Sequence, residues 1–128
     1  MPPKILIVDD SPAMQAIIVR ILAMAGFEVQ GCARAANGLE ALRTLRSVPF
    51  DLILADINMP VMDGEEMVRA IRSDPRLASI PVVVVSTDST DAEIRHMLDI
   101  GAQEYIAKPF TPEDLREVLA PFLGKVHA

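Results

Sequence analysis

The chain has one cysteine, no tryptophan and one tyrosine among its 128 residues. A single cysteine, Cys32, cannot form a disulfide within the chain, which is typical of proteins in a reducing compartment. The first residues do not have the pattern of a secretion signal, and no apolar run is long enough to span a membrane. These absences lead us to expect a cytoplasmic protein.

Basic residues are scarce relative to acidic ones. Twelve lysines and arginines stand against 18 aspartates and glutamates, so the formal net charge is −6. Nucleic acids and anionic lipids bind to basic surfaces, and this balance therefore argues against both as partners. The length fits one domain with a sizeable core, which we expect to span residues 1–128.

Apolar runs alternate with helical patterns five times along the chain. Alternation of this kind favours βαβ units and a parallel sheet. Three of the runs are apolar without alternation, which is typical of central strands covered by helices on both faces. We therefore predict an α/β fold with a five-stranded parallel sheet in the order 2-1-3-4-5 and five flanking helices. The expected strands cover residues 4–9, 28–33, 51–56, 81–86 and 103–107, and the expected helices cover 12–25, 37–47, 64–73, 91–100 and 112–123.

Three acidic residues stand where strands are expected to end. Asp9 and Asp10 follow the first strand, Asp56 follows the third, and Lys108 closes the fifth. The carboxyl ends of parallel strands lie along one edge of a sheet, where ligands bind. Three carboxylates in one place repel one another, so the cluster needs a cation or protonation, and oxygen ligands suit Mg²⁺. The sequence therefore predicts a magnesium site at this edge.

Two more groups indicate that the chemistry of this site is phosphoryl transfer. Ser86 ends the fourth strand, and its hydroxyl can bind a phosphoryl oxygen. The backbone carbonyl of Asn58, in the loop after Asp56, can supply another metal ligand. With Asp56 as the nucleophile and Lys108 as a positive charge, the set is suited to accepting a phosphoryl group.

These residues, taken in order, resemble the receiver domain of two-component response regulators along essentially the whole chain. The match is closest to the free-standing chemotaxis type. It rests on Asp9-Asp10, on the Asp56 loop with Met59-Pro60 and Asp63-Gly64, on Ser86-Thr87, on Tyr105 and on Lys108-Pro109-Phe110. The resemblance implies a flavodoxin-like, doubly wound fold. It also implies a phosphorylation-activated switch whose Asp56 accepts a phosphoryl group from a phosphohistidine in a Mg²⁺-dependent reaction.

The resemblance also assigns the metal ligands. Asp10, Asp56 and the carbonyl of Asn58 would bind Mg²⁺ directly, and Asp9 would act mostly through water. Asn58 and Asp88 resemble the two positions that tune the lifetime of the phosphoaspartate. The bond between Lys108 and the following proline resembles one that is cis in this family.

The remaining roles concern the switch. Ser86 and Lys108 would bind the phosphoryl oxygens, and Tyr105 would turn inward as Ser86 moves. The face formed by the fourth helix, the fifth strand and the fifth helix would then change shape. The partners implied are a sensor histidine kinase or a phosphotransfer domain, and a downstream protein target in chemotaxis or a phosphorelay. The chain would be a monomer or a phosphorylation-dependent dimer, and its only catalysis would be its own phosphoryl transfer and self-dephosphorylation.

Three other functions remain open from the residues. A Mg²⁺ phosphatase with an aspartyl nucleophile of the haloacid dehalogenase class would need an Asp-x-Asp motif, whereas Asp9-Asp10 is followed by Ser11-Pro12. A flavin carrier of the flavodoxin type would need a first loop that binds phosphate, and the acidic pair would repel it. A scaffold that has lost phosphorylation would not require the complete residue set.

Overall fold

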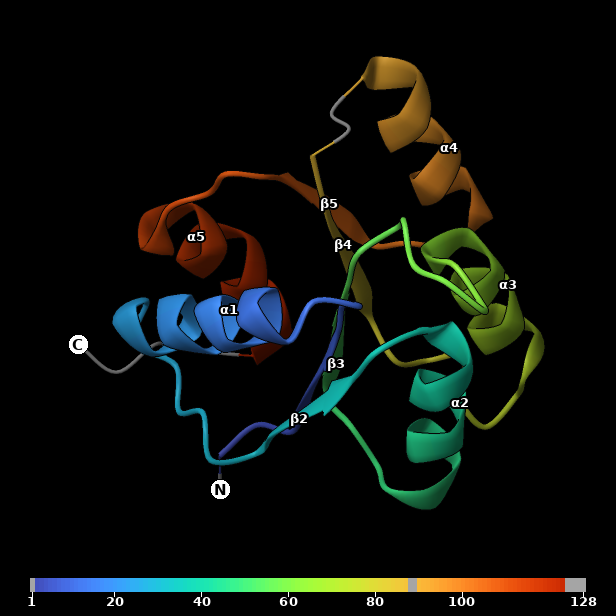
Figure 1. Cartoon of the computed structure of the whole chain (residues 1–128), viewed down its shortest axis with the longest axis horizontal. Coiled ribbons are helices and arrows are strands. Elements are labelled where there is room, and N and C mark those ends of the chain that lie inside the picture. The colour runs from blue at the N-terminus through green and yellow to red at the C-terminus, as the bar shows by residue number, and fades with distance from the viewer. Residues whose placement is uncertain (1, 88–89, 124–128) are drawn as a thin grey trace.

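The computed structural model describes residues 2–87 and 90–123, in which strands and helices alternate strictly (Figure 1). Each expected strand and helix is present. No helix in the described part of the chain is long and apolar enough to cross a membrane. In chain order the elements are β1 (Ile5–Val8), α1 (Pro12–Met24), β2 (Cys32–Ala35), α2 (Gly38–Ser47), β3 (Leu52–Ala55), α3 (Gly64–Ser73), β4 (Val82–Ser86), α4 (Asp91–Ile100), β5 (Glu104–Ala107) and α5 (Pro112–Leu123).

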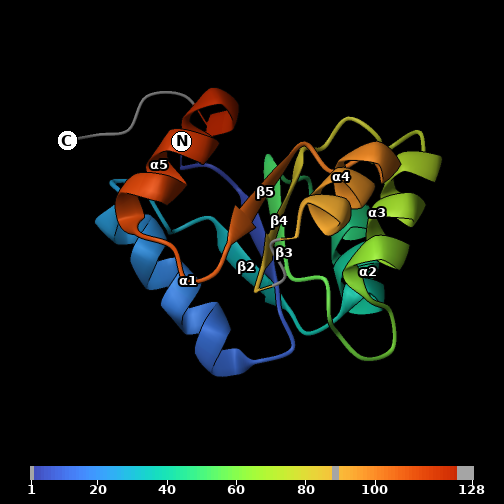
Figure 2. The same ribbon diagram turned by 90° about the horizontal axis from the view of Figure 1, so that it is seen from above.

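The strands form one parallel sheet in the order β2-β1-β3-β4-β5. Helices α1 and α5 cover one face, and α2, α3 and α4 cover the other (Figure 2). The predicted α/β architecture and the predicted strand order are therefore confirmed. This topology brings the carboxyl ends of β1, β3, β4 and β5 to a single edge.

Alternate residues of the central strands face two separate apolar layers. Leu6 and Val8 of β1 pack toward α2, α3 and α4, whereas Ile5 and Ile7 pack toward α1 and α5. β3 and β4 divide in the same way, and the described residues of all three strands are buried. Because both faces are covered, these strands need apolar side chains at every position, which explains their lack of alternation.

The second strand begins later than the sequence predicts. We expected residues 28–33, whereas β2 covers Cys32–Ala35. The amide of Cys32 donates a hydrogen bond to the carbonyl of Val29 at 3.1 Å, which closes a turn where the strand was expected. Pairing with β1 starts only beyond this turn, with Gly31 accepting from the first residue of β1. The expectation of a strand at 28–31 was therefore wrong.

Arg72 links the end of α3 to the two segments that lead into β4 and β5. Its Nε donates to the carbonyl of Gly101 at 2.9 Å, and its Nη1 donates to the carbonyls of Ala78 and Ile80 at 3.0 and 2.8 Å. Its Nη2 donates to Oε1 of Gln103 at 2.6 Å. One guanidinium therefore satisfies four acceptors from two connecting segments, which a lysine could not do with the same geometry.

Replacing Arg72 by alanine should lower the free energy of unfolding by about 2–3 kcal/mol, because several carbonyls lose a charged donor. Urea unfolding monitored by circular dichroism measures the change. The matched control is Arg69→Ala on the same helix, since within residues 2–87 and 90–123 the side chain of Arg69 makes only an exposed ion pair, with Glu65 at 3.2 Å. That control should cost less than about 0.5 kcal/mol. Equal losses in the two variants would contradict the role of Arg72.

Candidate functional site

The carboxylates of Asp9, Asp10 and Asp56 meet at the carboxyl edge of the sheet. One oxygen from each lies within 4.8 Å of the others. They meet because β1 and β3 are paired neighbours, with Val8 opposite Ala55, so that the residues after them leave the sheet side by side. Three carboxylates at this spacing offer the hard oxygen ligands that suit a divalent cation such as Mg²⁺.

Lys108 approaches this cluster from the end of β5. Its Nζ lies 3.3 Å from Oδ2 of Asp9 and 3.8 Å from Oδ2 of Asp56, and these side chains are 12%, 3% and 15% exposed. The amide of Lys108 donates to the carbonyl of Ser86 at 2.8 Å, which ties the lysine to the end of β4. The structure therefore brings together the acidic residues and the lysine that the sequence singles out. The Lys108–Pro109 peptide bond is cis, as the resemblance implies.

The two carboxylate oxygens of Asp56 have different surroundings. Oδ1 accepts a hydrogen bond from the amide of Ile57 at 2.8 Å, and Oδ2 faces Lys108. Burial raises the pKa of Asp56, while Lys108 and the amides of Ile57 and Asn58 act in the opposite direction. The neighbouring charge of Asp9 raises this pKa further. A cation bound here would favour the ionised form, which is the form that acts as a nucleophile.

The residues predicted to form the switch, Ser86 and Tyr105, lie on the paired strands β4 and β5. Ser86 ends β4 and is fully buried, whereas Thr87 is exposed. Tyr105 is half-buried, lies opposite Val84 in the pairing of β4 with β5, and packs against the apolar layer beneath α2, α3 and α4. The predicted movement of Ser86 and Tyr105 stays a prediction.

Of the two residues expected to tune the phosphoaspartate lifetime, the structure describes only Asn58. Asn58 lies in the loop after Asp56 with an exposed side chain. Asp88 lies outside the described residues. The role of this pair stays a prediction.

The loop that follows Asp56 is closed by a close backbone approach at Gly64. The amide of Gly64 donates to the carbonyl of Ile57 at 2.7 Å. A Cβ on Gly64 would lie 2.5 Å from the carbonyl oxygen of Asp56 and 2.7 Å from Cα of Ile57. Only glycine allows the start of α3 to approach the backbone of Asp56 this closely.

Replacing Gly64 by alanine should lower the free energy of unfolding by about 1–3 kcal/mol, because the added carbon displaces rigid backbone. Gly38→Ala is the matched control at the start of another helix. Its Cβ would lie 2.7 Å from Cγ of Met62, a flexible side chain that can turn away, and 3.0 Å from the carbonyl oxygen of Met62, which needs a smaller shift than the backbone beside Gly64. Chemical denaturation of both variants tests the difference, and a larger loss for the Gly38 variant would contradict it.

Val61, in the same loop, has a strained backbone. Its φ of 69° is the one positive value among the described non-glycine residues. The amide of Met62 donates to the carbonyl of Pro60 at 2.7 Å, so that Val61 is the middle residue of a tight turn. Its side chain points to solvent and is 74% exposed, so packing does not offset the strain. A β-branched residue is poorly suited to this conformation.

Val61→Asn should raise the free energy of unfolding by about 1 kcal/mol, because asparagine tolerates a positive φ. Thermal unfolding followed by circular dichroism detects this as a higher midpoint. Val61→Thr serves as the control, since threonine is polar but keeps the β-branch and should gain little. A comparable gain in both variants would assign the effect to polarity and not to strain.

One residue behind the acidic cluster was not predicted from the sequence. Gln15 of α1 is buried, and its side-chain amide donates to the carbonyl of Asp9 at 2.7 Å. The signal for it was present, because Gln15 shares the buried face of α1 with Ile18 and Leu22 at helical spacing. A polar residue in that register, just after an acidic pair, indicates a buried contact.

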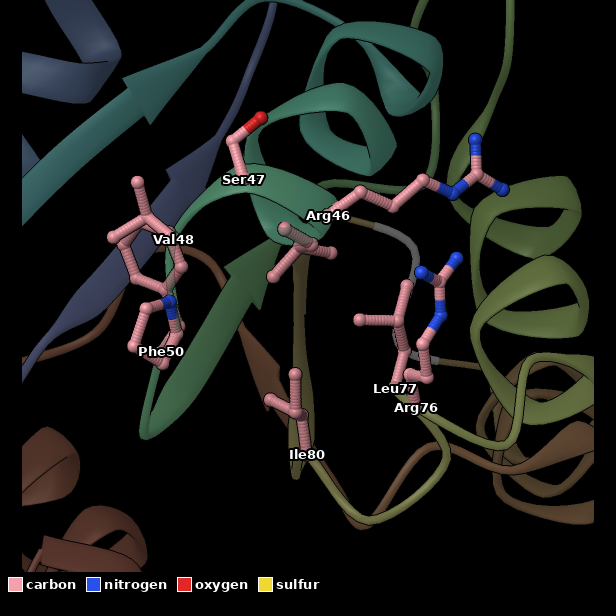
Figure 3. A pocket seen from close by; sticks show the side chains of 9 residues that line it. Arg46, Ser47, Val48, Phe50, Arg76, Leu77 and Ile80 are labelled. Atoms are coloured by element: carbon pink, nitrogen blue, oxygen red, sulfur yellow. The ribbon is translucent and has the colours of Figure 1, made fainter.

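Two cavities lie near the sheet edges. One, of about 320 Å³, opens beside Lys108 and is lined mainly by apolar residues of α1, such as Met14 and Ile17, and by Phe110. The other, of about 300 Å³, lies at the opposite, amino-terminal edge of the sheet (Figure 3). Figure 3 shows Arg46 and Arg76 at one side of it, and both pair with Asp74, at 3.8 and 3.6 Å. This second cavity is not part of the acidic site.

Comparisons with known proteins agree with this geometry. Residues 5–120 match the family model described as response regulator receiver domain. Chemotaxis protein CheY1 of Helicobacter pylori is 38% identical over 122 residues, which cover 94% of this chain and 97% of that relative.

Two solved structures add to this similarity. The chemotaxis protein CheY4 of Vibrio cholerae has a TM-score of 0.84 at 34% identity, covering 96% of this chain and 100% of that chain. The receiver domain of a Pseudomonas aeruginosa sensor histidine kinase, with a magnesium ion coordinated in its active-site cleft, has a TM-score of 0.84 at 28% identity. It covers 98% of this chain and 100% of that chain.

Proposed function

The chain belongs to the response regulator receiver domain family, and we propose that it is a phosphorylation-activated signalling switch with Asp56 as its phosphoacceptor. The observation that carries the proposal is the convergence of Asp56 with Asp9, Asp10 and Lys108 at one edge of the sheet. A carboxylate between an ammonium and further oxygen ligands can accept a phosphoryl group whose charge is neutralised on arrival.

The acceptor chemistry follows from the two oxygens of Asp56. Oδ1 accepts from the amide of Ile57, which orients the carboxylate, and Oδ2 lies toward Lys108. In transfer from a phosphohistidine, an Asp56 oxygen forms a bond to phosphorus as the P–N bond breaks. The donor imidazole leaves with the electron pair. Lys108 and the hydroxyl of Ser86 would then contact the phosphoryl oxygens.

The donor set suits Mg²⁺ as the cofactor. The magnesium ion in the similar kinase receiver domain supports this choice. Asp10, Asp56 and the Asn58 carbonyl would be the direct ligands, with Asp9 acting through water. When bound, Mg²⁺ would neutralise negative charge on the transferring phosphoryl group.

The signal would be the charge added to Asp56. Phosphorylation adds nearly two negative charges and strong hydrogen-bond acceptors beside Ser86. Tyr105 is suited to respond, because it lies on the strand paired with β4 and is already half-buried. The surface formed by α4, β5 and α5 would then select a downstream protein.

The surroundings of Asp56 suit a protein as the donor of the phosphoryl group. The cavity beside Lys108 presents mainly apolar side chains from α1 and from Pro109 and Phe110 next to the acidic cluster. Such a surface suits contact with a sensor histidine kinase or a phosphotransfer domain better than recognition of a small polar donor. The similarity to chemotaxis proteins supports a role in chemotaxis or a phosphorelay.

Incubation of the purified chain with acetyl phosphate and Mg²⁺ should add one phosphoryl group, detected as a mass increase of the intact protein. The adduct should be absent in Asp56→Asn, which keeps the size of the side chain but removes the nucleophile. It should also be absent when EDTA removes the metal.

Other outcomes would favour the alternative functions. Absence of any adduct on the unaltered chain would support a phosphorylation-independent scaffold. Repeated turnover of a phosphomonoester would support a Mg²⁺ phosphatase. An adduct that persists in Asp56→Asn would place the acceptor elsewhere.

A further inference from the structure

Gln15, in the first turn of α1, is a buried amide directly behind the acidic cluster. Among the described residues, the buried polar or charged ones are Asp9, Gln15 and Ser86. The other two belong to the proposed phosphoacceptor site. Burial of an amide is costly unless its hydrogen bonds are made, so its partners indicate what it does.

The amide of Gln15 connects three elements at one point. Its Nε2 donates to the carbonyl of Asp9 at 2.7 Å and to the carbonyl of Ala35 at 3.2 Å. The amide of Asp9 donates to the same Ala35 carbonyl at 3.0 Å. Gln15 therefore links α1 to the carboxyl ends of β1 and β2, where the main chain turns away from the sheet.

The carbonyl that Gln15 binds belongs to the peptide group between Asp9 and Asp10. Because that group is planar, the oxygen of Asp9, the nitrogen of Asp10 and the two α-carbons rotate together. A hydrogen bond to the oxygen therefore restricts the direction in which Asp10 leaves the strand. Asp10 is exposed and its carboxylate has no hydrogen bond to the described residues, so the main chain sets the position from which its side-chain rotamers can reach a cation.

The side chain of Asp9 is oriented by other groups. Its Oδ1 accepts from the amide of Ser11 at 2.9 Å, and its Oδ2 accepts from Nζ of Lys108 at 3.3 Å. These contacts do not involve Gln15. Loss of the Gln15 amide would therefore leave Asp9 and Lys108 in place and act mainly on Asp10.

We propose that Gln15 is a positioning residue for the cation site, acting through the Asp9–Asp10 peptide group. The inference rests on the proposed function, because it takes Asp10 as a direct cation ligand. It assigns to Gln15 an effect on the affinity for Mg²⁺ and not on the transfer of the phosphoryl group, since among the described residues its side-chain amide bonds to Asp9 and Ala35 and not to Asp56 or Lys108.

The test is the Mg²⁺ dissociation constant of Gln15→Met, measured by calorimetric titration of the intact chain. Methionine keeps the volume and flexibility of glutamine but removes the donor. The dissociation constant should rise about tenfold, as it does when groups that orient a metal ligand are lost. Leu22→Met, a volume-conserving change on the buried face of the same helix, should leave it unchanged.

A second readout separates positioning from general damage to the fold. At saturating Mg²⁺, phosphorylation of Gln15→Met by acetyl phosphate should proceed at the rate of the unaltered chain. An unchanged dissociation constant would overturn the inference, as would a slow rate that saturating Mg²⁺ does not restore. If Gln15→Met fails to fold, Gln15→Asn, which keeps the amide but withdraws it by one bond, should show the same rise.

The same titrations distinguish failure of the proposed function from failure of the inference about Gln15. If the unaltered chain binds no Mg²⁺, both the proposed function and this inference are wrong. If the unaltered chain binds Mg²⁺ and Gln15→Met binds it equally well, only the inference is wrong.

Discussion

Repulsion among the carboxylates of Asp9, Asp10 and Asp56 is the constraint on which the site depends. Oxygens from three acidic side chains lie within 4.8 Å of one another, and Asp9 is almost fully buried. Such an arrangement persists only if positive charge is placed beside it. Lys108 supplies part of that charge, and its contacts with Asp9 and Asp56 show why a residue 52 positions beyond Asp56 belongs to the same site.

The sheet provides a rigid base for these charges, whereas the loop above it carries strain. Asp9, Asp56 and Lys108 each follow directly after a strand whose pairing fixes its position. The loop from Asp56 to α3, in contrast, contains the positive φ of Val61 and the close approach of Gly64 to the Asp56 carbonyl. Strain of this kind persists where the surrounding structure over-determines a conformation, and it is common at functional sites.

Much of the fold could be predicted from local patterns. The central strands were recognisable because burial on both faces demands apolar residues throughout, and helix starts were marked by capping residues. Ser11, for example, accepts from the amide of Met14 at 3.2 Å, and Pro12 follows it at the first helical position. β2 was misplaced because residues 28–31 partly alternate as a strand would, although the backbone turns at Val29 and Cys32.

The site was predictable where residue type and strand ends coincide, as for Asp56 and Lys108. Features that depend on the approach of distant backbone segments could not be predicted from the sequence. Nothing local to Gly64 reveals that it lies against the Asp56 carbonyl, and the partners of Gln15 lie at the ends of two different strands. The role of Arg72 likewise depends on carbonyls 6 to 29 residues away.

The placement of Lys108 after the last strand has a consequence for the protein during its synthesis. The carboxylates of Asp9 and Asp56 leave the ribosome well before the lysine that neutralises them, because it lies 99 residues beyond Asp9. Domains generally fold as units during synthesis. A nascent chain that stops short of β5 therefore contains the carboxylates of Asp9 and Asp56 without the ammonium group that lies beside them, and their charge is balanced only after β5 joins the sheet.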